Sequence, residues 1–143
     1  MRYLGIDWGT KYVGLAISDE KEQFSFPYKV LKNVSDNFLT HQIYKILIKE
    51  GITKVVVGLP VTLDGREGKA SEKVIQFVEK MKSSKKFQGI TFEFFDERLT
   101  TKLVEKELNI VKKRIKNRKY IINMATAQKI LQDYLEFKKT RTE

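Results

Sequence analysis

The chain has 143 residues and a formal net charge of +10, a length that fits one domain spanning residues 1–143. The absence of cysteine excludes disulfides and thiolate metal sites, and the single histidine, His41, excludes a histidine-rich zinc site. No apolar run approaches the roughly 20 residues of a membrane span, so we expect a cytoplasmic protein without membrane contact. The surplus of Lys and Arg predicts a polyanionic partner, most often nucleic acid.

Three strands are predicted at the start of the chain, over residues 2–8, 12–18 and 24–32. In the second segment Val13, Leu15 and Ile17 alternate with small residues, which is the period of a strand. Pro27 cannot donate a hydrogen bond to a neighbouring strand, so the third strand is expected at an edge of the sheet or with a break in it. The three segments together predict an antiparallel meander.

The pattern then changes to helical spacing. Apolar residues between Leu39 and Leu47 recur at that spacing, and Gly51 is a natural stop for a helix. The β-branched run 54–59 is typical of a strand buried on both faces. A loop over 60–69 and a second helix through 74–81 follow.

The last third of the chain is predicted to hold one strand and two helices. The strand covers 91–95 and ends in Asp96-Glu97-Arg98, and the helices run from Thr100 or Thr101 to about 111 and from about 123 to 137. The order βββ-α-β-α-β-α-α predicts an α/β fold with a mixed five-stranded sheet flanked by helices, in which parallel strands follow the meander through helical crossovers.

Acidic residues stand at the carboxyl ends of two apolar strands. Asp7 ends the first strand, and Asp96 and Glu97 end the last. In a sheet of this order the two strand ends can be close neighbours, and converging carboxylates repel one another unless divalent cations neutralise them. Oxygen ligands select Mg²⁺ or Mn²⁺, which suits phosphodiester hydrolysis. Alternatively, Asp7 caps the glycine turn, and Asp96 and Glu97 form a solvated strand end.

Basic residues are concentrated in one segment of the second half. Residues 112–119 hold six of them and no acid: Lys112, Lys113, Arg114, Lys116, Arg118 and Lys119. The segment is either a solvated connector or a region that contacts phosphate, and the two interpretations are compatible. Further candidate contacts to nucleic acid are Thr10, Lys11, Arg66, Lys69 and Arg98.

Three sequence blocks and the last helix resemble the YqgF family. The blocks are residues 4–16 around Asp7, Val57–Pro60 with Asp64-Gly65, and 96–100, and residues 125–135 resemble the C-terminal helix of the family. The resemblance implies an RNase H-like fold related to Holliday junction resolvases. It implies a nuclease described as processing the 5′ end of pre-16S rRNA, and earlier as a junction resolvase, with metal ligands at Asp7 and Glu97.

Asn123 departs from the family pattern, which has an aspartate early in the last helix. Asn123, Ala127, Ile130 and Tyr134 share one helical stripe that should face the sheet. The amide oxygen can bind a metal but brings no charge, so weaker binding of a second metal is expected. Alternatively, Asn123 caps the helix, a position that favours asparagine.

We therefore predict a metal-dependent endonuclease for structured RNA, with catalytic residues Asp7, Glu97 and Asn123 and with Asp96 as a further candidate ligand. Pre-rRNA is favoured over branched DNA as the substrate. Two alternatives stay open. One is a Holliday junction resolvase, which needs a symmetric dimer, and the other is a nucleic-acid-binding protein in which Asn123 has removed catalysis. The sequence is compatible with a monomer or a homodimer.

Overall fold

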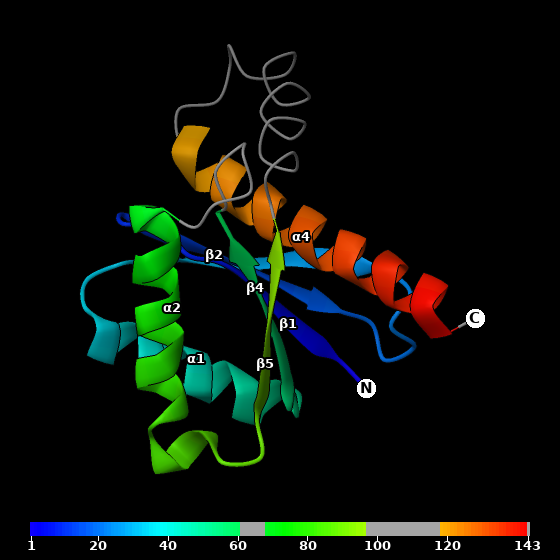
Figure 1. Cartoon of the computed structure of the whole chain (residues 1–143), viewed down its shortest axis with the longest axis horizontal. Coiled ribbons are helices and arrows are strands. Elements are labelled where there is room, and N and C mark those ends of the chain that lie inside the picture. Colours follow the sequence, from blue (N-terminus) through cyan, green and yellow to red (C-terminus); the bar gives the residue numbers. More distant parts are fainter. Residues whose placement is uncertain (61–67, 97–117, 143) are drawn as a thin grey trace.

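The computed structural model describes residues 1–60, 68–96 and 118–142, which form a sheet with helices on both faces (Figure 1). The elements in chain order are β1 (Tyr3–Asp7), β2 (Tyr12–Ser18), β3 (Ser25–Lys32), α1 (Asp36–Glu50), β4 (Lys54–Leu59), α2 (Lys69–Lys82), the 3-10 turn η1 (Lys85–Phe87), β5 (Thr91–Asp96) and α4 (Arg118–Thr142). The predicted helix between Thr100 and residue 111 lies outside the described residues.

The sheet has five strands in the order β3-β2-β1-β4-β5. β2 pairs antiparallel with β1 and β3, whereas β4 pairs parallel with β1 and β5. The predicted mixed sheet is confirmed. One detail differs from expectation, because β4 separates the ends of the first and last strands. The carboxyl ends of β1 and β5 point the same way but lie about 10 Å apart, so they are not adjacent.

β3 is an edge strand and also has an irregularity, whereas Pro27 predicted one or the other. Leu15 pairs with Lys29 and Ala16 with Pro27, so Tyr28 is an extra residue on the β3 side. Such a β-bulge bends the strand and changes the direction of its side chains.

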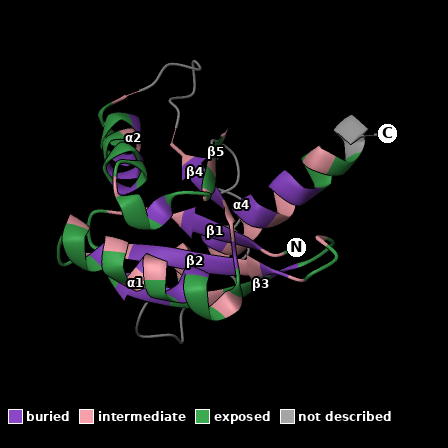
Figure 2. Cartoon of the chain, turned by 90° about the horizontal axis from the view of Figure 1, so that it is seen from below, coloured by how far each residue is buried: buried purple, intermediate pink, exposed green. Residues whose placement is uncertain are grey.

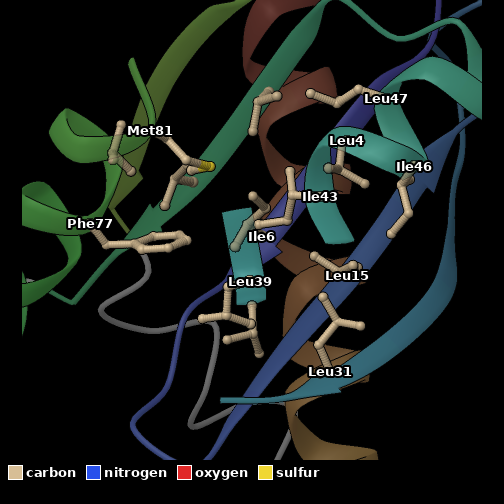
Figure 3. Close-up of a cluster of buried hydrophobic side chains, with 14 of the residues drawn as sticks. Leu4, Ile6, Leu15, Leu31, Leu39, Ile43, Ile46, Leu47, Phe77 and Met81 are labelled. Carbon is tan, nitrogen blue, oxygen red and sulfur yellow. The ribbon is translucent and has the colours of Figure 1, made fainter. Parts of the chain in front are cut away.

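One face of the sheet is covered by α1 and α2. Figure 3 shows side chains of both helices, among them Ile43 and Phe77, packed against Leu4, Ile6 and Leu15 of the sheet. The Ser35 hydroxyl accepts a hydrogen bond from the Phe38 amide (3.1 Å) where α1 begins. The helix ends at Gly51, whose φ of 64° is left-handed and favours glycine. The predicted helix boundary is confirmed.

The other face is covered by α4, and the central strands are buried (Figure 2). Ala127, Ile130 and Tyr134 pack against Tyr3, Ala16 and Val56. Val55 and Val57 belong to the opposite core. This arrangement confirms that the run 54–59 is a strand buried on both faces, and that the predicted stripe of the last helix faces the sheet.

The start of α4 corrects the sequence prediction. The helix begins at Arg118, five residues before Asn123. Asn123 therefore lies inside the helix and does not cap it, and Arg118 and Lys119 of the basic segment belong to the first turn of α4. Within the described ranges, no helix is both long and apolar enough to cross a membrane.

Candidate functional site

Asp7 ends β1 on the face of the sheet that α4 covers. Side chains alternate along a strand. Tyr3 packs in the α4 core, and a Cβ on Gly5 would lie 2.9 Å from the Leu131 Cβ, so Asp7 shares their face. Its side chain is half-buried. The strand end thus presents a carboxylate beneath the N-terminal half of α4.

Gly14 places Asn123 beside Asp7. Gly14 is the residue on β2 directly opposite Asp7 in the antiparallel ladder, where paired Cα atoms lie about 5 Å apart. A Cβ on Gly14 would lie only 2.0 Å from the Asn123 carbonyl oxygen. The backbone of α4 therefore rests directly on the strand next to Asp7, on the face that Asp7 occupies. Two of the predicted site residues are brought together in this way.

Gly58 leaves room on the other side of Asp7. Ile6 pairs with Val57, so Asp7 and Gly58 are the next residues along β1 and β4. Val56 faces α4, and by alternation Gly58 faces it too. Because glycine has no side chain, the space between Asp7 and the end of β5 is not filled from β4.

The two acids at the end of β5 have different placements. Phe95 packs in the α4 core, whereas Phe92 packs against the opposite core. By alternation Asp96 shares the face of Phe92, away from Asp7. Glu97 lies outside the described residues. Among the residues that the structure describes, no group of three His, Cys, Asp or Glu side chains could hold a metal ion.

The turn after Asp7 is held in place by a residue that the sequence did not single out. The Asn33 side chain donates a hydrogen bond to the Gly9 carbonyl (2.8 Å), and the Asn33 backbone N–H donates one to the Lys11 carbonyl (2.8 Å). A Cβ on Gly9 would lie 2.5 Å from the Tyr12 carbonyl oxygen, so the turn needs glycine there. These contacts fix Thr10 and Lys11, both exposed, at the edge of the sheet near Asp7.

A hollow of about 280 Å³ lies between this turn and α2, and we call it the β1–α2 hollow. Trp8, Thr10, Pro60, Ala70 and Lys73 are among its lining residues. The Trp8 ring packs against Phe77 with centroids 6.2 Å apart. Sequence reasoning missed Lys73. The available signal was its position one helical turn after Lys69.

The other predicted contacts to nucleic acid are only partly described. Lys69 is exposed at the start of α2. Arg118 and Lys119 lie in the first turn of α4, and nothing further is described of their side chains. The remaining candidates lie outside the described residues: Arg66, Arg98, Lys112, Lys113, Arg114 and Lys116.

The strand order, the helices on both faces and the carboxylate beneath α4 define an RNase H-like fold of the resolvase type. A solved structure supports this class: RuvC of T. thermophilus in complex with a Holliday junction substrate matches with a TM-score of 0.62. The match covers 97% of this chain and 96% of the RuvC chain at 15% sequence identity, so it establishes the fold.

The chain belongs to the RuvX family, described as Holliday junction resolvase, whose model matches residues 1–137. Two relatives are provisionally named pre-16S rRNA nuclease. The one from Desulforudis audaxviator is 34% identical over 140 residues, covering 98% of this chain and 97% of the relative. The one from Clostridioides difficile is 36% identical over 137 residues, covering 96% and 95%. The resemblance noted in the sequence is confirmed.

Family membership makes this chain a nuclease, a hydrolase that acts on phosphodiester bonds and binds nucleic acid. It implies a divalent metal in general. The described donors fit such an ion, because Asp7 offers a carboxylate and the neighbouring Asn123 offers an amide, both hard oxygen ligands.

Proposed function

We propose that this protein is a metal-dependent endonuclease of the cytoplasm that hydrolyses structured RNA, acting in 5′-end processing of pre-16S rRNA. The observation that carries the proposal is the contact of the α4 backbone at Asn123 with Gly14, next to Asp7. The names of the relatives support RNA as the substrate.

Asp7, Glu97 and Asn123 are the proposed ligands of Mg²⁺ or Mn²⁺. Phe95, two residues before Glu97 in the sequence, packs on the Asp7 face, and Gly58 leaves space between the two strands. Asp96 is left out of this set, because alternation directs it to the other face. When bound, a divalent cation stabilises charge that develops on the phosphate and lowers the pKa of a bound water.

The turn after Asp7 is proposed to orient the substrate. Thr10 offers a hydroxyl and Lys11 an ammonium group at the edge of the sheet, and the Asn33 hydrogen bonds fix the backbone between them. Lys73 adds a second cation in the β1–α2 hollow. We propose that a phosphate adjacent to the cut lies between Thr10 and Lys73. The basic residues 112–119, Lys69, Arg66 and Arg98 are proposed to bind phosphates further away.

A Holliday junction resolvase is the second candidate, and the description of the matching family model favours it. Cutting one RNA strand requires one site, so a monomer is sufficient for the leading proposal. Resolving a four-way junction requires paired cuts and therefore a homodimer with two sites.

A side-by-side cleavage assay tests the substrate class. A 5′-extended 16S rRNA fragment and a four-way DNA junction are incubated with Mg²⁺, with Mn²⁺ and with a chelator. We expect defined product ends on the RNA alone, lost with the chelator. Metal-dependent cutting of the junction alone would favour the resolvase, and cutting of neither substrate would favour a protein that binds without catalysis.

A further inference from the structure

A larger hollow, of about 470 Å³, lies on the α1 side of the sheet, opposite the face of Asp7. Its lining residues include Tyr28 and Lys29 of β3 and Gln42, Lys45, Ile48 and Lys49 of α1. We call it the β3–α1 hollow. None of these residues takes part in the site described above.

The β-bulge builds one wall of this hollow. In a regular strand Tyr28 and Lys29 would point to opposite faces. Lys29 pairs with Leu15, whose side chain belongs to the core on the α1 side, and Tyr28 packs against that same core. Because the bulge sets two residues of β3 against one of β2, both side chains line the hollow.

The charged residues that line the hollow are all positive. Lys29 lines it from β3, and Lys45 and Lys49, which are one turn apart on α1, line it from the helix. None of the lining residues is acidic, and within the described part of the chain none of the three lysines forms an ion pair. The nearby Glu50 accepts hydrogen bonds from the Arg2 guanidinium (2.9 Å) and the Tyr28 hydroxyl (3.2 Å).

We propose that the β3–α1 hollow binds the sugar-phosphate backbone of an RNA strand at a distance from the cut. Three exposed lysines on two elements suit a row of phosphates better than one small anion, which a protein holds with convergent buried donors. The half-buried Tyr28 lines the hollow beside them. The identification of the strand as substrate RNA rests on the proposed function, whereas the polyanionic ligand rests on the hollow itself.

The position of the β3–α1 hollow allows one RNA molecule to contact both the hollow and the candidate site at Asp7. Lys29 pairs with Leu15 of β2, and Leu15 pairs with Ile6 of β1, the residue before Asp7. Two strand spacings, about 10 Å, separate Lys29 from β1 across the sheet. Since β3 is the edge strand, an RNA that crosses this edge would pass from the Asp7 face to the hollow.

The test is RNA binding by the triple variant Lys29→Gln, Lys45→Gln and Lys49→Gln, measured without divalent metal so that no cleavage occurs. A matched control, Lys21→Gln, Lys82→Gln and Lys85→Gln, removes the same charge from exposed positions elsewhere. We expect affinity for a structured RNA fragment to fall roughly tenfold to 100-fold at 0.1 M salt. The slope of log K against log salt should fall by about 0.7 for each phosphate that the variant no longer binds. The control should change the affinity much less.

Two further measurements complete the test. Replacing the same lysines by arginine should restore binding, which separates the removal of charge from misfolding. Millimolar AMP or inorganic phosphate should not displace the RNA, and displacement would overturn the proposal in favour of a small-anion site. Equal affinity of the glutamine variant and the control would also overturn it. A loss of binding in a protein that cuts no RNA would support the hollow while contradicting the proposed function.

Discussion

At Gly14 the missing side chain decides where the last helix can lie. The Asn123 carbonyl oxygen lies only 2.0 Å from the position that a Cβ would take, and Asp7 is the neighbour of Gly14 across the ladder. A Cβ on Gly5 of β1 would lie 2.9 Å from the Leu131 Cβ of α4, which is a less close approach. These two glycines let the helix backbone approach the sheet, and only Gly14 does so at the candidate site.

We predict that Gly14→Ala destabilises the fold by about 3 kcal/mol and disturbs the site, because the obstructing atom is backbone that cannot rotate away. Gly5→Ala is the matched comparison. Its nearest contacts, the Leu131 Cβ at 2.9 Å and the Ala127 carbonyl oxygen at 3.2 Å, are less close than the 2.0 Å contact at Gly14, so we expect a smaller cost of about 1 to 2 kcal/mol. Urea unfolding of both variants gives the two values. Equal costs would mean that the close approach at Asn123 is not a special constraint.

Asn123→Asp is predicted to tighten binding of Mn²⁺ at least tenfold and to raise metal-dependent cleavage. The substitution adds a carboxylate where α4 meets the strand beside Asp7, and one added charge near a dication is worth several kcal/mol even at an effective dielectric of about 20. Gln76→Glu adds the same charge on the exposed side of α2 and serves as the control. If the two variants bind metal equally, Asn123 is not a ligand position.

At the scale of elements, polar and ring contacts attach α4 to β5, to β1 and to the turn between β2 and β3. The Tyr134 hydroxyl donates to the Glu93 carboxylate on β5, and the Tyr134 ring packs edge-on against Tyr3 of β1 with centroids 5.6 Å apart. Lys138 donates to the Tyr3 hydroxyl and to Glu22. These contacts fix the C-terminal half of α4, and through it the position of Asn123.

Tyr134→Phe is predicted to cost about 1 kcal/mol at neutral pH, since it removes one hydrogen bond to an exposed carboxylate. Burial first, and then the bond to Glu93, raise the pKa of Tyr134 above its ordinary value of 10.0. The folded protein therefore keeps this proton longer than the unfolded chain, so the contribution is complete below pH 10 and is lost as the pH rises above it. Denaturant unfolding of both proteins from pH 8 to 11 should show the difference shrinking above pH 10.

The elements with strong patterns were predictable from the sequence. Gly51 ended α1 as expected, and Pro27 indicated the irregular edge strand. The start of α4 was placed too late because Asn123 is a favourable cap. The residues before it contain no proline or glycine, and Arg and Lys are good helix formers, so the helix extends back to Arg118.

The candidate site was predictable only as a set of residues. The sequence indicated Asp7 and Asn123, but their proximity depends on how α4 crosses β2 at Gly14, which no local pattern reports. Alternation along the strand would have predicted that Asp96 and Phe95 point to opposite faces of the sheet. Lys73 and Asn33 were missed because their roles arise from packing between segments that are far apart in the sequence.

At the scale of the whole molecule, one sheet serves two cores. Its α1 and α2 face and its α4 face share β1, β2 and β4, so neither layer of helices has a strand set of its own. The candidate site lies on the α4 side, whereas the β3–α1 hollow lies on the other. Substrate binding across both faces would depend on the sheet remaining intact.

The shared sheet predicts a single cooperative unfolding transition. Trp8, the one tryptophan of the chain, packs against Phe77 on the α2 side and reports on that layer by fluorescence. Far-UV circular dichroism reports on all the helices, including α4. We expect the two urea curves to coincide. Loss of helical signal before the Trp8 transition would instead show that α4 detaches by itself.

Cleavage of a 5′-extended 16S rRNA fragment by the parent protein and by Asp7→Asn, with RNA binding measured in parallel, tests the central claim most directly. The account predicts that the parent cuts only when Mg²⁺ or Mn²⁺ is present. It predicts that Asp7→Asn cuts at least about 100-fold more slowly, since a ligand charge worth several kcal/mol is removed, while binding the RNA equally well. Undiminished, metal-dependent cutting by Asp7→Asn would contradict the account.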